Sequence, residues 1–245
     1  MGRPVIDFVN TDDLPLHEVV LPGADRPCCV RELSRDAVSG ERSLVLDLPA
    51  GWCRTTAGAS DRDEELFVLA GALVDDGDAL SRYSYVFRSA GRQRTAMRTE
   101  QGGRVLVFER PGTAYRPERD VAPLNLAALD WERPRTPNFP AGAARKTLRI
   151  DPFDNSGLWV IGLLPHWASP FTEWHTVEEE NYVLEGEIET TAGCMRPGAY
   201  LAHPPEMVHG PMRSRPGALA ITRAAAGAFL TTYTRVPDYA FPQEV

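Results

Sequence analysis

Short apolar runs, separated by glycine, proline and aspartate, dominate the hydrophobic pattern of the chain. The clearest runs cover residues 44–48, 66–69, 85–87, 105–108, 159–164, 182–184 and 219–222. Runs of this length between turn signals are typical of strands in a sandwich or barrel. Few stretches carry the 3.6-residue apolar period of a helix, and residues 124–129 could form one helical turn or two. The pattern therefore predicts an all-β protein.

The pattern also repeats at an offset of 115 residues. When residues 45–71 are placed over residues 160–186 without a gap, eight of the 27 positions are identical. The identical pairs include Trp52 with Trp167 and Glu64 with Glu179. A register held over this length favours duplicated domains, which we place at residues 1–120 and 121–245.

A segment rich in proline and arginine, residues 109–146, lies between the repeats. It is too long for a tight turn, and we expect it to cross from one domain to the other. Its apolar side chains need cover, which favours packing along the way over a disordered linker. These side chains are Tyr115, Leu124, Leu126 and Trp131.

Composition and charge narrow the function classes. The 245 residues are 43% hydrophobic and 24% charged, with 20 glycines and 21 prolines, as in a turn-rich globular β protein. The net charge of −8 argues against broad binding of nucleic acid or anionic lipid. No apolar run approaches the ~18–20 residues that span a bilayer, and no secretory signal is evident, so we expect a cytoplasmic protein. The four cysteines show no C-x-x-C pair, which fits a reduced compartment.

Histidines are distributed unevenly along the chain. Four of the five lie between residues 166 and 209, and only His17 lies in the first half. Imidazole is the commonest metal ligand in proteins, so this clustering is the first indication of chemistry.

Two motifs carry the candidate chemistry. The first, EWHTVEEENYVLEG, contains Glu173, His175, Glu179 and Gly186. The second, YLAHPPEMVHGP, follows a Pro197–Gly198 turn and contains His203, Pro204, Glu206 and His209. Residues i and i+2 of a strand point to one face, so Glu173 and His175 could both face an interior. Two imidazoles with one or two carboxylates suit one divalent transition metal ion: Fe, Mn, Zn, Ni or Co.

This arrangement resembles the two motifs of the cupin superfamily. The resemblance implies two tandem jelly-roll barrels (double-stranded β-helices), that is, a bicupin similar to bacterial proteins related to the cupin domain of an anti-sigma factor. It places the metal ligands at Glu173, His175, Glu179 and His209. The chain departs from the family pattern at Glu173, where the first motif histidine is usual, and at Glu206, where glycine is usual. The extra carboxylate favours harder ions, or else metal binding has been lost.

The first repeat lacks this donor set. By the offset, His175 corresponds to Ser60, His209 to Arg94 and Glu173 to Gly58, and only Glu64 remains. We expect a degenerate first barrel that is structural or binds a ligand without metal. Arg88, Arg92 and Arg94 could hold an anion there or form a solvated basic edge.

His203 is the candidate catalytic residue, as a general acid or base or as a substrate ligand. A rim histidine bonded to a neighbour is the plainer alternative. Other candidates near the second site are His166, Trp167, Trp174, Tyr182, Tyr200 and Met207. Of the glutamates 178–180, strand alternation turns Glu179 inward and leaves its neighbours solvated or paired.

Three functional hypotheses follow. The first is a metal-dependent enzyme acting on a small organic molecule, where the resemblance allows a diketone-cleaving dioxygenase, an isomerase, a cyclase or a lyase. The second is a non-catalytic ligand- or metal-sensing module that acts through a protein partner. The third is a sugar- or acid-binding barrel without metal. We expect a monomer or a homodimer that binds neither nucleic acid nor membrane.

Overall fold

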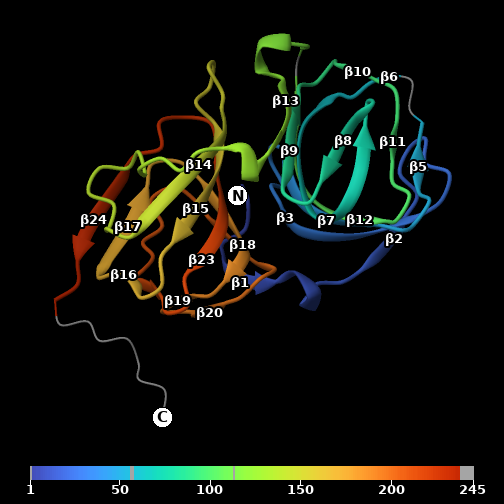
Figure 1. Ribbon diagram of the computed structural model, residues 1–245. Coiled ribbons are helices and arrows are strands. Elements are labelled where there is room, and N and C mark those ends of the chain that lie inside the picture. Colours follow the sequence, from blue (N-terminus) through green and yellow to red (C-terminus); the bar gives the residue numbers. More distant parts are fainter. Residues whose placement is uncertain (1, 56–57, 113, 238–245) are drawn as a thin grey trace. The chain divides into compact units, whose positions relative to one another are not determined.

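The computed structural model describes residues 2–55, 58–112 and 114–237, which divide into two compact units. Unit 1 comprises Met1–Pro4 and Thr11–Asp130, and unit 2 comprises Val5–Asn10 and Trp131–Val245. Both are built almost entirely from strands, and the helices of the described residues are single 3₁₀ turns. None of these helices is long and apolar enough to cross a membrane. The prediction of a β-rich protein is thus confirmed (Figure 1).

Unit 1 is organised around one large antiparallel sheet. Its elements are η1 (Thr11–Asp13), β2 (His17–Val19), β3 (Cys28–Arg35), β4 (Arg42–Leu48), β5 (Cys53–Arg54), β6 (Gly58–Ala59), β7 (Arg62–Asp75), β8 (Asp78–Ser81), β9 (Ser84–Arg88), β10 (Gln93–Arg94), β11 (Met97–Arg98), β12 (Gly103–Pro111), η2 (Pro117–Arg119), β13 (Val121–Asn125) and η3 (Leu126–Ala128). The main path runs β13-β9-β7-β12-β4-β3-β2, with β5, β8 and β11 attached and β6 paired to β10.

Unit 2 has three sheets. Its strands are β1 (Ile6–Asn10), β14 (Ala143–Ile150), β15 (Gly157–Leu163), β16 (Trp167–Ser169), β17 (Phe171–His175), β18 (Glu179–Gly186), β19 (Ile188–Thr190), β20 (Gly193–Met195), β21 (Ala199–His203), β22 (Met212–Ser214), β23 (Ala218–Ala224) and β24 (Thr231–Arg235). The sheet orders are β1-β21-β18-β23-β15-β14, β16-β22-β19-β20 and β17-β24.

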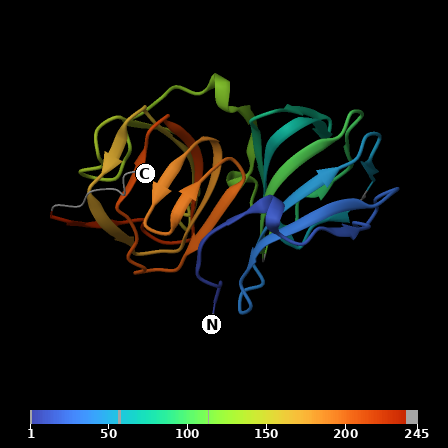
Figure 2. The ribbon, with the colours of Figure 1, turned by 90° about the horizontal axis from the view of Figure 1, so that it is seen from below.

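The strands of each unit wrap around that unit's own apolar core (Figure 2). Trp52 is fully buried in the core of unit 1, and Trp167 is 5% exposed in the core of unit 2. This agrees with a packing role for the repeated tryptophan. Between the repeats, Leu126 is buried, whereas Tyr115 and Trp131 are both 48% exposed. Residues 124–129 form the end of β13 and the single turn η3.

The elements of the two units recur at the 115-residue offset found in the sequence. When the residue numbers of β3, β4 and β9 in unit 1 are raised by 115, they equal the bounds of β14, β15 and β21 in unit 2. Gly71 and Gly186 both have φ +74°, and a Cβ atom there would lie 2.3 Å and 1.9 Å from the carbonyl oxygens of Gly102 and Gly217. Because no side chain fits in that turn, glycine is required at this position of both repeats.

The first strand of each repeat lies in the other unit. By the offset, β1 and β13 are equivalent, yet β1 pairs with β21 in unit 2 and β13 pairs with β9 in unit 1. The registers match, since Val9 faces Tyr200 in one unit and Leu124 faces Tyr85 in the other. The two compact units therefore do not coincide with the domains 1–120 and 121–245, because each unit contains the first strand of the other repeat.

Candidate metal centre in unit 2

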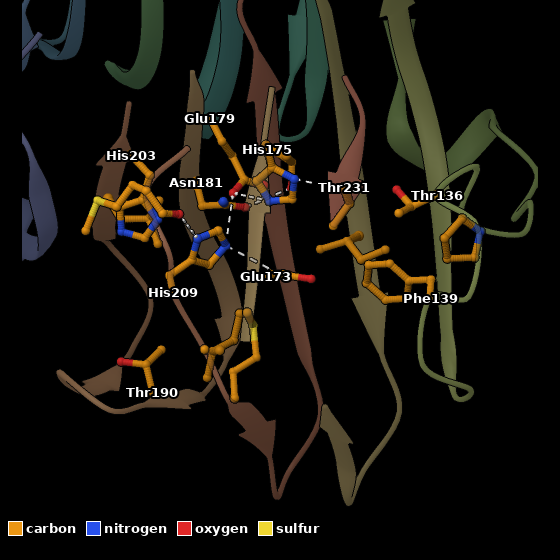
Figure 3. Close-up of a pocket in the computed structure, with 18 of the residues that line it drawn as sticks. Thr136, Phe139, Glu173, His175, Glu179, Asn181, Thr190, His203, His209 and Thr231 are labelled. Atoms are coloured by element: carbon orange, nitrogen blue, oxygen red, sulfur yellow. Dashed lines mark hydrogen bonds and ion pairs between the residues drawn. The ribbon is translucent and has the colours of Figure 1, made fainter. Parts of the chain in front are cut away.

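Three strands of unit 2 and the segment after the last of them bring the motif residues together (Figure 3). Glu173 and His175 lie on β17, and their spacing places both side chains on one face. Glu179 begins β18, and its register partner on the neighbouring strand is His203, the last residue of β21. His209 follows β21 and is tied to Glu173 by two backbone hydrogen bonds of 2.8 and 2.9 Å.

The side chains of these five residues form one compact, buried cluster. His175 Nε2 lies 3.2 Å from Glu179 Oε2, and His209 Nε2 lies 3.5 Å from Glu173 Oε1 and 3.7 Å from Glu179 Oε2. None of the five is more than 12% exposed. Buried ionisable groups this close together need a proton, an ion or a partner to balance their charge.

Two overlapping groups in the cluster have ligand atoms close enough to hold a metal ion. Glu173, His175 and His209 form one, and Glu179, His203 and His209 form the other, with all ligand atoms in each group within 4.8 Å of one another. His203 Nδ1 is buried and lacks a hydrogen-bond partner among the described residues, and His175 Nε2 is buried with the Glu179 carboxylate 3.2 Å away. Imidazole nitrogens buried beside two carboxylates are the donor set of a divalent transition metal site, so the residues fit such an ion.

Contacts of the Nδ1 atoms orient the rings of His175 and His209. His209 Nδ1 lies 3.1 Å from the Met207 carbonyl oxygen, and a carbonyl can only accept, so Nδ1 carries the proton. The Nε2 lone pair of the neutral ring then points into the cluster. His175 Nδ1 lies 2.9 Å from Thr231 Oγ1, and the His175 ring stacks on Phe229 with centroids 4.4 Å apart. Contacts of this kind orient metal ligands in proteins.

Burial and mutual charge shift the titration of the cluster. Burial raises the pKa of Glu179, but the neighbouring histidines outweigh it and lower the pKa to about 2. Burial also opposes protonation of His209, yet the hydrogen bond to Glu173 and the two carboxylate charges raise its pKa to about 9. For His203, burial and the positive charge of His209 lower the pKa to about 4. At neutral pH the ion-free cluster thus holds a protonated His209 beside a neutral His203.

The cluster lies in a cavity of 160 Å³ within unit 2. Much of the remaining wall is apolar. The apolar side chains include Phe139, Trp159, Ile161, Leu163, Met195 and Met212. Asp7, on the exchanged strand β1, also lines the cavity, as do Asn181 and Tyr233.

The other sequence candidates have separate places. Trp167 and Met207 line the cavity, whereas His166 is exposed and does not. Tyr200 is buried and donates a hydrogen bond to Glu180, which also pairs with Arg223 at 2.5 Å. Glu179 faces the cavity while Glu180 is paired elsewhere, as strand alternation predicted.

Sequence reasoning missed Asp7, Thr231, Phe229 and Tyr233. The last three lie on or next to β24, which pairs with β17, and Asp7 lies on β1, which pairs with β21. No motif marks these residues, because the pairings join segments far apart in the sequence.

Unit 1 carries a charge pair in the equivalent place. Gly58 pairs with Arg94 as Glu173 does with His209, and Glu64 faces Arg88 as Glu179 faces His203. Arg94 Nη1 lies 2.6 Å from Glu64 Oε2, and Ser60 donates to Glu64 at 3.2 Å.

The arginines of unit 1 near this place are held in ion pairs. Arg88 is buried between Asp75 and Asp78, and Arg92 pairs with Asp120 at 2.6 Å. Arg88, Arg92 and Arg94 thus all pair with carboxylates of the chain. They do not form the solvated basic edge or the anion site that the sequence suggested.

Comparisons with solved structures identify the type of fold. A candidate dioxygenase from Nostoc punctiforme is similar with a TM-score of 0.84 and 21% identity over 99% of this chain and 92% of that chain. The oxalate decarboxylase of Lactobacillus farciminis, in a formate complex, gives 0.61 and 13% over 92% and 87%. The Bacillus subtilis oxalate decarboxylase, studied for its Mn(II) centres, gives 0.57 and 12% over 95% and 80%. At these identities the likeness shows a cupin-like fold.

Sequence comparison adds the family. No curated protein matches the sequence. A family model described as a domain of unknown function, DUF4437, matches residues 7–227. The chain therefore belongs to the DUF4437 family.

Proposed function

We propose that this protein is a metal-dependent enzyme acting on a small organic molecule. The supporting observation is the cluster of imidazoles and carboxylates that lines a cavity and contains two groups of three residues, each with its ligand atoms within 4.8 Å of one another. The fold is that of cupin-like proteins, among them an oxalate decarboxylase whose Mn(II) centres have been studied. We extend the proposal to the architecture, in which each repeat is a cupin barrel and only the second holds an ion.

Glu173, His175, Glu179 and His209 would hold the ion, with Thr231 and the Met207 carbonyl orienting the two rings. A bound divalent ion would supply Lewis acidity and, if it is iron or manganese, redox chemistry. His209 must release its proton to bind, and Glu179 is already ionised at neutral pH.

His203 is the proposed acid–base residue. It is neutral at neutral pH and 5% exposed, and its ring lies 4.7 Å from that of His209. A neutral imidazole at the cavity wall can take a proton from a bound substrate and return it at another atom. The apolar wall residues would exclude water and fit the carbon skeleton of the substrate. Dioxygenation, for example of a diketone, isomerisation and cyclisation all use such a set of groups.

Metal content after purification tests the proposal. The wild-type protein should carry close to one equivalent of a divalent transition metal, and the double variant His175→Ala/His209→Ala should carry almost none. The matched control is His17→Ala/His166→Ala, which removes two exposed histidines outside the cluster. Equal metal in the wild type and the His175/His209 variant would refute the metal site.

Activity and His203 are tested separately. Oxygen uptake with a 1,3-diketone probe tests for dioxygenase activity. Product analysis with the same probe tests for isomerisation and cyclisation. His203→Gln should retain the metal and lose turnover at least a hundredfold. Loss of metal in His203→Gln would make His203 a ligand. A metal-loaded wild type that turns over no candidate substrate but copurifies with a partner would favour the sensing module.

A further inference from the structure

Unit 1 has a cavity of its own, at the same place in the repeat as the metal-site cavity of unit 2. Its volume is 260 Å³, and its walls come from β2, β3, β4, β5, β7, β11 and β12. Most lining positions coincide with those of unit 2 at the 115-residue offset. The coincident pairs include Leu44 with Trp159, Leu46 with Ile161, Glu64 with Glu179, Met97 with Met212 and Val107 with Thr222. The two repeats thus have a cavity in the same place, but the cluster of histidines and glutamates is found in unit 2 alone among the described residues.

Two positions of the cavity wall are more apolar in unit 1 than in unit 2. Asn181 and Thr222 of unit 2 are replaced by Leu66 and Val107 in unit 1. Glu64, the remaining motif carboxylate, is already neutralised by Arg94 at 2.6 Å. An ion therefore has no free carboxylate to bind there, and the walls favour a hydrocarbon group instead.

The charged groups around the cavity leave one cation without a partner. Arg35 pairs with Glu32, and Arg42 pairs with Glu109 at 2.6 Å. Arg54 also lines the cavity, is half-buried, and makes no ion pair with a described residue. His17, the remaining titratable group of the lining, is exposed. A carboxylate bound at Arg54 would satisfy this guanidinium by paired hydrogen bonds.

We propose that unit 1 binds, without a metal ion, a small amphipathic carboxylate. The carboxylate contacts Arg54, and the hydrocarbon chain lies among Leu44, Leu46, Leu66 and Val107. This second site is independent of the function proposed for unit 2.

Isothermal titration calorimetry of the full-length protein with octanoate tests the proposal. Octanoate should bind with one equivalent, and each methylene removed in hexanoate and butanoate should weaken binding roughly three- to fourfold. Octanol, which lacks the charge, should bind at least tenfold more weakly. Arg54→Gln should reduce octanoate affinity to the level of octanol.

Matched cavity-filling variants locate the site. Leu46→Phe should abolish binding, and Ile161→Phe, at the equivalent position of unit 2, should leave it unchanged. Circular dichroism checks that both variants fold. Hydrogen exchange on the wild type requires no variant, and octanoate should protect β3 and β4 rather than β14 and β15.

Three results would overturn the proposal. They are no octanoate binding, loss of binding in Ile161→Phe but not in Leu46→Phe, and protection confined to unit 2. Removing the metal, or introducing His209→Ala, should leave octanoate binding intact, so failure of the metal proposal is distinguishable from failure of this one.

Discussion

Arg94 Nη1 lies 2.6 Å from Glu64 Oε2 in unit 1, and these two residues occupy the positions that His209 and Glu179 occupy in unit 2. In unit 1 the buried carboxylate is balanced by a cation that is part of the chain. In unit 2 the equivalent carboxylate faces imidazoles, which can exchange a proton for an ion. One structural position thus has a permanent charge balance in one unit and an exchangeable one in the other.

The first prediction concerns this pair. Arg94→Met should lower the free energy of unfolding by about 3 kcal/mol, because it leaves Glu64 buried and unpaired. The double variant Arg94→Met/Glu64→Leu should recover most of the loss. Urea denaturation measures both, with Arg98→Met as a control at an exposed arginine of β11. Equal effects at Arg94 and Arg98 would mean that the pair contributes little.

The second prediction concerns the support of His175. Thr231→Val removes the hydroxyl 2.9 Å from His175 Nδ1 and should weaken Mn²⁺ binding tenfold to a hundredfold. Calorimetric titration with Mn²⁺ measures the effect. Thr234→Val changes an exposed threonine on the same strand and should bind Mn²⁺ as the wild type does. If Thr231→Val binds Mn²⁺ normally, the hydroxyl does not position the ring.

The third prediction concerns Glu206, which stands where the resembling motif has glycine. Its φ is +65°, a conformation that costs a residue with a Cβ roughly 1–2 kcal/mol. Glu206→Gly should therefore raise the free energy of unfolding by up to about 1 kcal/mol, after the entropy of glycine is subtracted. Glu206→Ala keeps the Cβ and should give no gain. A glycine variant less stable than the alanine variant would contradict this explanation.

The fourth prediction concerns acid stability. Hydrogen bonds from Thr147 and Arg145 lower the pKa of Glu132 from 4.5 to about 2. Because the folded value is depressed, the stabilisation is present above pH 4.5 and is lost as the pH falls towards 2. Glu132 is partly exposed, so solvent screening limits the effect to about 1 kcal/mol.

Urea midpoints at pH 3 and pH 6 measure it. Glu132→Gln should flatten the difference between the two midpoints, and the control Glu118→Gln, at an exposed glutamate of η2, should keep it. If both variants change the difference between the two midpoints to the same extent, Glu132 has no special role in acid stability.

Sequence periodicity anticipated the strands because most of them are short apolar runs between turn residues. Strand alternation also predicted that Glu173 and His175 share one face, whereas the set of Glu173, His175, Glu179 and His209 came from the motif resemblance. These four side chains lie near one another in the structure, and their role as ligands stays a prediction. Sequence periodicity could not anticipate Thr231 or Asp7, which reach the cavity only through pairings of distant strands. Nor could it anticipate the Arg94–Glu64 pair, because nothing in the sequence shows whether an arginine faces solvent or a buried carboxylate.

The exchange of first strands also sets an order of events during synthesis. β1 leaves the ribosome about 190 residues before its partner β21, a delay of roughly 10–40 s at bacterial and eukaryotic elongation rates. Unit 1 can close as soon as β13 emerges, because that strand arrives after its partner β9. Unit 2 must retrieve a strand made before the whole of the first repeat's sheet, and until it does β21 presents an open edge. A nascent chain that stops within the second repeat, before β21, therefore contains a folded unit 1 and an unpaired β1.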